Sequence, residues 1–180
     1  LWGWGDPLRD KPRVNLLLRS LRKMQQVSRK YPVTARMVKW LHKQLDPNDP
    51  DTVVVLGSID IGWVWLLRAG EYLCRDGVGW DHPRVATGAG FTFRQKGEVV
   101  SRAEDAEEAR LHFKSSKADI FNAGEHRTLF RSEREICPVE ALARIQRRFP
   151  QRFGSGEEAH LPLFRLSDGS PLLRSTVQKW

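Results

Sequence analysis

Cysteine and tyrosine are scarce in this sequence, with two of each among 180 residues. Cys74 and Cys137 both lie in apolar stretches, so we expect reduced packing residues and not a disulfide or a metal-binding pair. The five histidines lack the paired spacing of metal ligands, and a glycine-rich phosphate loop is absent. The sequence therefore gives no support to a metalloprotein or a P-loop protein, and we expect no metal and no cofactor.

Long apolar runs are also missing. The longest one, residues 53–67, is shorter than the roughly 20 residues of a membrane span and contains Asp60. We therefore expect a buried core helix there and no membrane span. No intact signal or transit peptide is visible, although a cleaved one would leave no trace. The sequence does not determine the compartment. We expect an intracellular protein, in the nucleus or in an organelle.

Positive charge is in excess. The chain has 30 Lys and Arg against 22 Asp and Glu, a formal net charge of +8 and a pI of about 9.9. This balance points to nucleic acid or another polyanion as a partner. A basic subunit of a large ribonucleoprotein or membrane assembly is the alternative, and net charge alone does not separate the two.

The length and the 40% hydrophobic content suit one core domain. We expect an extended arm over residues 1–12 and a core domain over residues 13–180. Trp2 and Trp4 in the arm would dock either onto a protein partner or onto the chain's own core, and these two alternatives remain equal.

Four segments have the apolar spacing or the capping residues of helices: residues 14–29, 34–45, 52–67 and 138–149. Thr34 is the expected N-cap of the second helix and Pro138 opens the fourth. The third is apolar around most of its circumference. The side chains expected to face inward are Met37, Trp40 and Leu41 in the second helix and Ala141, Leu142 and Ile145 in the fourth.

The first and fourth helices carry basic residues on their polar sides. These residues are Arg19, Arg22, Lys23, Arg144, Arg147 and Arg148. A row of cations on a helix suits contacts with a phosphate backbone, so these six are the predicted nucleic-acid-binding residues.

The middle of the chain predicts a small antiparallel sheet. Its strands are expected at residues 91–94, 98–100, 109–114 and, on return, near 128–131. The acidic stretch 101–108 is expected to be a solvated insertion. Lys117 would lie at the tip of the sheet, where the alternative is an ordinary solvated loop lysine. The fold class is therefore α+β, mainly helical, with an antiparallel sheet of about three strands.

Arg68 falls where the apolar helix ends, and we expect it in the last turn, three residues before Glu71. A guanidinium held by its own carboxylate can form a fixed fork for a phosphate group. The alternative is a surface arrangement in which Arg68 complements the helix dipole and pairs locally with Glu71.

The order of these parts resembles the catalytic core of the tyrosine recombinases, the phage-integrase-like enzymes, and most of all the type carried by eukaryotic retrotransposons. In that family an Arg-x-x-Glu box ends a helical stretch and a small sheet follows with a lysine in its hairpin. Arg68 and Glu71 match the box, and Lys117 matches the lysine. Other matching pieces are Pro32-Val33-Thr34, Lys117-x-Asp119 and Ile136-Cys137-Pro138-Val139. The resemblance runs from about residue 5 to residue 180.

The resemblance implies DNA strand breakage and rejoining. Arg68 would be one of two arginines that hold the scissile phosphate and stabilise its developing charge, and Glu71 would orient it. Lys117 would be the general acid that protonates the leaving 5′ oxygen.

Part of the family pattern is missing. The family's His-x-x-Arg box, a further His or Trp and the nucleophilic tyrosine lie C-terminal to the matched region, whereas Tyr31 and Tyr72 both precede Lys117 and His160 is followed by Leu-Pro-Leu. We therefore expect an integrase-like core without its C-terminal helices, which binds DNA or RNA and does not cut on its own. The absence of an initiator methionine favours a cut or processed product. The alternative is a domesticated, non-catalytic remnant, kept as a structural or binding subunit of a ribonucleoprotein or organellar assembly.

Overall fold

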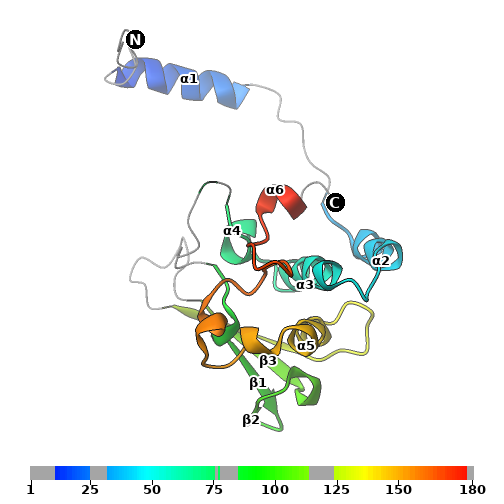
Figure 1. The fold of residues 1–180 in the computed structure, drawn as a ribbon. Helices are drawn as coiled ribbons and strands as arrows, with labels where there is room; N and C mark the ends of the chain where they lie inside the picture. Colours follow the sequence, from blue (N-terminus) through cyan, green and yellow to red (C-terminus); the bar gives the residue numbers. More distant parts are fainter. Residues whose placement is uncertain (1–10, 25–31, 76, 78–84, 114–123, 178–180) are drawn as a thin grey trace. The chain divides into compact units, whose positions relative to one another are not determined.

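The computed structural model describes residues 11–24, 32–75, 77, 85–113 and 124–177, without the side chains of residues 22–24 and 113 (Figure 1). Trp2, Trp4 and Lys117, and the side chains of Arg22 and Lys23, lie outside the described part. The chain forms two compact units, Leu1–Pro32 and Val33–Trp180.

The first unit contains α1, Pro12–Met24, which confirms the predicted amphipathic helix over most of its length. Its leucines are largely uncovered: Leu16, Leu17 and Leu21 are 66%, 61% and 50% exposed. Arg19 is exposed as well. This helix therefore presents both apolar and basic groups to its surroundings.

The second unit is an α+β fold, as predicted. Its helices are α2 (Ala35–Gln44), α3 (Pro50–Val64), α4 (Ala69–Tyr72), α5 (Pro138–Arg148) and α6 (Arg174–Val177). Its strands are β1 (Phe91–Gln95), β2 (Glu98–Val100), β3 (Glu108–Phe113) and β4 (Glu125–Phe130). They form one antiparallel sheet in the order β2-β1-β3-β4, so the sheet has four strands and not about three. No helix of the described residues is long and apolar enough to cross a membrane.

The β1–β2 hairpin forms where the sequence predicts it. Lys96 and Gly97 make the two-residue turn with φ values of 49° and 86°. Two successive positive φ values belong to a type I′ turn, whose twist matches that of the paired strands. Gly97 adopts this conformation at little cost, because it has no Cβ.

Helix α2 begins at the predicted residue but turns a different face inward. The Thr34 hydroxyl accepts a hydrogen bond from the Met37 amide at 3.4 Å, which confirms the N-cap. Val38 is fully buried, whereas Met37 and Trp40 are 51% and 57% exposed. The inward prediction for Met37 and Trp40 was therefore wrong. Among the described elements, helix α2 packs chiefly against α3, and Val38 is its buried contact residue.

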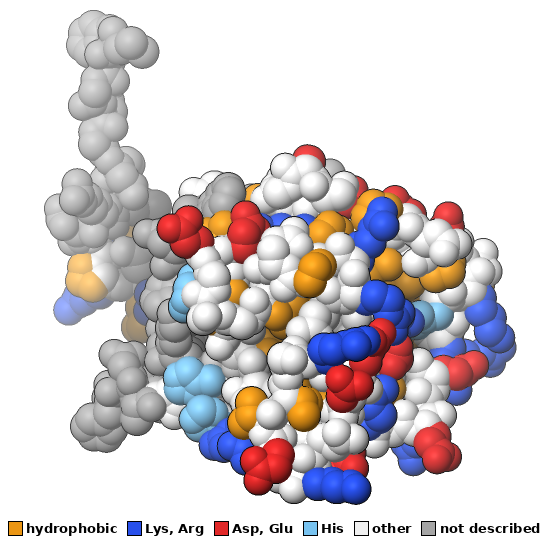
Figure 2. Space-filling model, turned by 60° about the horizontal axis from the view of Figure 1, so that its bottom comes forward, with side chains coloured by type: hydrophobic (Ala, Val, Ile, Leu, Met, Phe, Trp, Pro, Cys, Tyr) orange, Lys and Arg blue, Asp and Glu red, His pale blue; other side chains and the backbone are white. Residues whose placement is uncertain are grey.

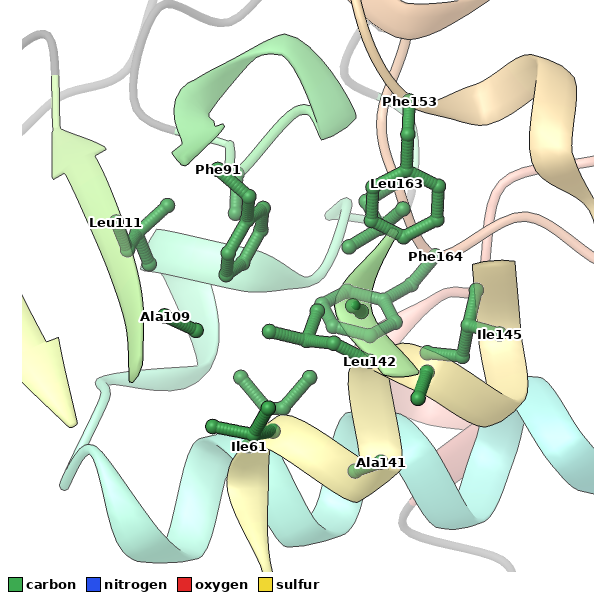
Figure 3. Close-up of a cluster of buried hydrophobic side chains, with 14 of the residues drawn as sticks. Ile61, Phe91, Ala109, Leu111, Ala141, Leu142, Ile145, Phe153, Leu163 and Phe164 are labelled. Carbon is green, nitrogen blue, oxygen red and sulfur yellow. The ribbon is translucent and has the colours of Figure 1, made fainter. Parts of the chain in front are cut away.

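The hydrophobic core lies between α3, α5 and one face of the sheet (Figure 3). Ala141, Leu142 and Ile145 of α5 are fully buried, as predicted. Gly57 lets α3 approach α5 closely, because a Cβ placed there would lie 2.6 Å from the Cδ1 atom of Ile145. A larger residue at this position would have to displace the end of the Ile145 side chain.

A buried carboxylate joins three of the helices. Asp60 of α3 is fully buried and accepts hydrogen bonds from Arg144 of α5 at 3.0 Å and from the His42 ring of α2 at 2.8 Å. Arg144 was predicted to face outward, but its guanidinium turns back to this carboxylate. The low dielectric of the core makes an unpaired charge costly, and this cost explains the inward turn.

The segment after α5 is fixed by Arg152, which is 3% exposed. Its guanidinium donates to the carbonyl oxygens of Leu163, Arg165 and Leu166 and lies 3.7 Å from the centre of the Phe149 ring. Burial, and then the charge of Arg165, lower the pKa of Arg152 to about 10. One buried side chain thus joins three carbonyl groups of the segment 163–166, which fixes this segment to the end of α5.

We predict that Asp60→Asn lowers the free energy of unfolding by about 2 to 3 kcal/mol, because Arg144 loses its counter-charge while the packing volume is kept. Urea unfolding followed by circular dichroism measures the change. Asp105→Asn, at a carboxylate that is 54% exposed, is the control and should shift stability by less than about 0.5 kcal/mol. Equal unfolding midpoints for both variants and the wild type would show that the buried cluster does not hold the helices together.

Candidate functional site

Helix α3 ends in a strained turn. The Leu67 amide donates to the Gly62 carbonyl at 2.9 Å and the Leu66 amide to the Trp63 carbonyl at 3.4 Å, the bonding pattern of a Schellman motif. Leu66 occupies the position where glycine is usual, with φ at 52°, and its side chain is 83% exposed. Folding thus holds an apolar side chain in a strained conformation and in water. This turn reverses the chain directly before Arg68.

Arg68 precedes α4 as its N-cap, so the prediction that it lies in the last turn of α3 was wrong. The two carboxylate oxygens of Glu71 accept hydrogen bonds from different groups of Arg68. One accepts a hydrogen bond from the Arg68 backbone amide at 2.9 Å, and the other accepts from the Arg68 Nη1 atom at 3.0 Å. The predicted ion pair is therefore present, and it is half-buried.

The two members of this pair differ sharply in exposure. The Glu71 side chain is 9% exposed and the Arg68 side chain 69%. A carboxylate anchored in the fold thus holds a guanidinium that faces solvent. An arginine fixed in this way loses less conformational freedom when it binds an anion than one on a flexible side chain.

Arg127 of β4 lies at the same end of α3. Its Nη1 atom donates to the carbonyl of Trp65, the residue before Leu66, at 3.3 Å, and its side chain is 30% exposed. Sequence reasoning missed this residue. The signal available was its place in the strand that returns from the hairpin, opposite Leu111 of β3.

Tyr72 packs into the fold. Its ring meets Phe164 edge to face at 5.9 Å between ring centres, and a Cβ on Gly62 would lie 2.4 Å from its hydroxyl oxygen. Burial raises the pKa of Tyr72 above its usual value of 10.0. The expectation that this ring packs is confirmed, and a high pKa makes the hydroxyl a poor nucleophile.

The predicted basic face of α5 is largely neutralised. Besides the Arg144 contact with Asp60, the Arg147 Nε atom bonds Glu104 at 2.6 Å, and Arg148 is exposed. Glu104 belongs to the acidic stretch that was expected to be solvated, but residues 103–105 form a short 3-10 helix that packs against α5. Hydrogen bonds from Arg147 and then Arg102 lower the pKa of Glu104.

Positive charge is instead concentrated at the beginning of the chain. Residues 1–32 contain eight Lys and Arg against two Asp and Glu, whereas residues 33–180 contain 22 against 20. On the face shown in Figure 2, Lys and Arg groups lie next to Asp and Glu groups. Six of the eight net charges therefore come from the unit that includes α1 and Arg19. A count by segment would have found this from the sequence.

No metal site emerges from the described residues, where no group of three or more His, Cys, Asp or Glu side chains could hold an ion. Cys74 and Cys137 are both free and buried, as predicted. Burial raises the pKa of the Cys74 thiol, which keeps it protonated near neutral pH.

A groove of about 880 Å³ runs beside α2, the end of α3 and β4. Trp63, Val64 and Phe130 give it an apolar lining, and Phe130 is 67% exposed. An ion pair between Lys39 and Glu135 at 2.5 Å crosses its rim. An apolar lining with a neutral rim suits a protein segment better than a polyanion.

We predict that Glu71→Ala lowers the free energy of unfolding by about 1 to 3 kcal/mol, since both the Arg68 amide and its guanidinium lose their acceptor. Thermal melts measure the effect. Glu98→Ala, an exposed change in β2, serves as the control and should leave the melting temperature nearly unchanged. Small and equal shifts for both variants would return Arg68 and Glu71 to an ordinary surface pair.

Comparisons with known proteins identify no relative of this chain. No family model matches the sequence, and no curated protein and no solved structure matches it. The resemblance to the tyrosine recombinases therefore rests on the residues named for it.

Proposed function

We propose that this chain is the nucleic-acid-binding part of a tyrosine-recombinase-like core, which acts in DNA strand breakage and rejoining and is not catalytic on its own. The observation that carries the proposal is the guanidinium of Arg68, exposed to solvent and held by the buried carboxylate of Glu71. A planar fork held in this way suits two oxygens of a phosphodiester.

Electrostatics divide the binding between two parts of the chain. The Arg68 and Glu71 charges cancel at a distance, so this pair positions a phosphate without supplying much long-range attraction. The excess charge of residues 1–32 supplies that attraction. Arg19, Arg22 and Lys23 therefore keep their proposed role in nucleic-acid binding, whereas Arg144 does not, because Asp60 holds it.

Two further assignments rest on the resemblance alone. Lys117 would be the general acid toward the leaving 5′ oxygen, a role that suits a mobile ammonium group. Duplex DNA is the proposed ligand because the family acts on it. RNA is the alternative, because its phosphate backbone would attract the same basic residues.

We predict salt-dependent, largely sequence-independent binding of duplex DNA, because phosphate contacts release counterions. Fluorescence anisotropy between 50 and 200 mM salt, about the range over which such contacts weaken strongly, measures it. Arg68→Gln should reduce affinity roughly 10- to 150-fold, the effect of one charged hydrogen-bonding contact. Arg36→Gln removes the same charge from an exposed position in α2, outside the site, and should have a smaller effect.

Two results would contradict this proposal. Binding that is absent at low salt, or that is indifferent to salt, removes the nucleic-acid function. Equal losses for Arg68→Gln and Arg36→Gln remove the special place of Arg68 and leave only a general effect of charge.

A second candidate function is a non-catalytic module that binds a protein partner, as a domesticated remnant would. The apolar groove beside β4 favours it, because Trp63 and Phe130 offer the aromatic surface on which protein interfaces concentrate. Phe130→Ser would weaken such a partner and leave DNA affinity unchanged, so one variant separates the two functions.

We predict that this chain forms no covalent phosphotyrosine link with a nicked suicide DNA substrate. Tyr72 is packed against Phe164 and its pKa is raised, so it is not available as the nucleophile. Denaturing gel electrophoresis of the reaction reports any adduct. An adduct that disappears in Tyr72→Phe or Tyr31→Phe would overturn the non-catalytic part of the proposal.

A further inference from the structure

The outer face of the sheet carries a cationic cluster that the proposed function has not used. Ala109 and Leu111 of β3 are fully buried, so the residues that alternate with them, Arg110 and His112, face away from the core. We propose that Arg110, His112 and His126 form a phosphate-binding site on this face, separate from Arg68.

Strand register brings these three side chains together. His112 of β3 lies opposite His126 of β4, and their ring centres are 4.4 Å apart. Arg110 lies one row along the same face, between Thr92 of β1 and Thr128 of β4. The cluster therefore combines one guanidinium, two imidazoles and two hydroxyl groups on three adjacent strands.

Among the residues that the structure describes, two features indicate that no carboxylate is paired with this cluster. The Nε atom of Arg110 is buried and has no hydrogen-bond partner. The next row holds the carboxylate of Glu108, but this lies 3.9 Å from Arg94 of β1. Partial loss of hydration, and then the charges of Arg110 and His112, lower the pKa of His126 below its usual 6.5. An anion would give the Arg110 Nε atom an acceptor and would offset the positive charges that lower the pKa of His126.

Phosphate is the anion that fits these groups best. Arginine offers a planar fork that suits phosphate oxygens, and the threonine hydroxyls and imidazole N–H groups can donate to the rest. Bound phosphate would also favour the protonated form of the histidines, since an opposite charge nearby stabilises the imidazolium. The same chemistry is offered by inorganic phosphate and by the backbone of a nucleic acid.

The two sources have different consequences. A backbone phosphate here would mean that the sheet face lies against the nucleic acid, and that reading rests on the proposed function. Free phosphate or a phosphorylated small molecule would make this an independent site. The experiment therefore uses both ligands.

The test follows the histidine ring signals of the full chain by NMR between pH 5 and 8, a range that brackets the usual histidine pKa. Titrations are compared in chloride, in inorganic phosphate at equal ionic strength, and with a short DNA duplex. We expect the pKa of His126 to rise by about 0.5 to 1 with at least one of the two ligands. His160, an exposed histidine in the 3-10 helix Glu157–His160, is the internal control and should not respond.

Variants tie the effect to the cluster. Arg110→Gln should abolish the rise, and Arg36→Gln, which removes an exposed charge from α2, should keep it. Arg110→Lys retains the charge but not the planar fork, so it should keep only part of the rise in the pKa of His126.

The outcome also identifies the source. A rise with DNA alone assigns the site to a backbone phosphate, and a rise with inorganic phosphate alone assigns it to a free ligand. No rise with either ligand, or an equal rise at His160, overturns the site. If DNA binds without moving His126, the inference fails and the proposed function stands. If DNA does not bind but inorganic phosphate raises the pKa of His126, the phosphate site stands and the proposed function fails.

Discussion

The buried carboxylate of Asp60 is the constraint on which the second unit depends. Helix α3 is apolar on nearly every side, so hydrophobic contacts alone do not fix its rotation. Asp60 does fix it, because a carboxylate in the core must meet Arg144 of α5 and His42 of α2. Once this rotation is set, the end of α3 has a defined direction, and the turn at Leu66 places Arg68 outside the core.

Carboxylates also neutralise several arginines at the surface of the second unit. Three arginines of the second unit are paired with carboxylates: Arg144 with Asp60, Arg147 with Glu104 and Arg131 with Glu140. Arg68 is also paired, but its partner Glu71 is buried and leaves the guanidinium exposed. This asymmetry, and not the net charge of +8, distinguishes Arg68 from its neighbours.

Sequence reasoning succeeded where local chemistry decides the structure. Thr34 and Pro138 mark the beginnings of their helices, and the Lys96–Gly97 turn marks the hairpin, because capping and positive φ depend on neighbouring residues. It failed where contacts join distant parts of the chain. Arg144 meets a residue 84 positions away and Arg147 one 43 positions away, and a helical stripe contains no information about such partners.

The proposed function requires that nucleic acid contacts residues 1–32 and the turn that carries Arg68. Hydrogen exchange of the backbone amides, with and without duplex DNA, tests it most directly. We expect slower exchange in α1 and at residues 66–72, and unchanged exchange in α2 and along the apolar groove. Protection confined to α2 and the groove, or no protection anywhere, would contradict the account.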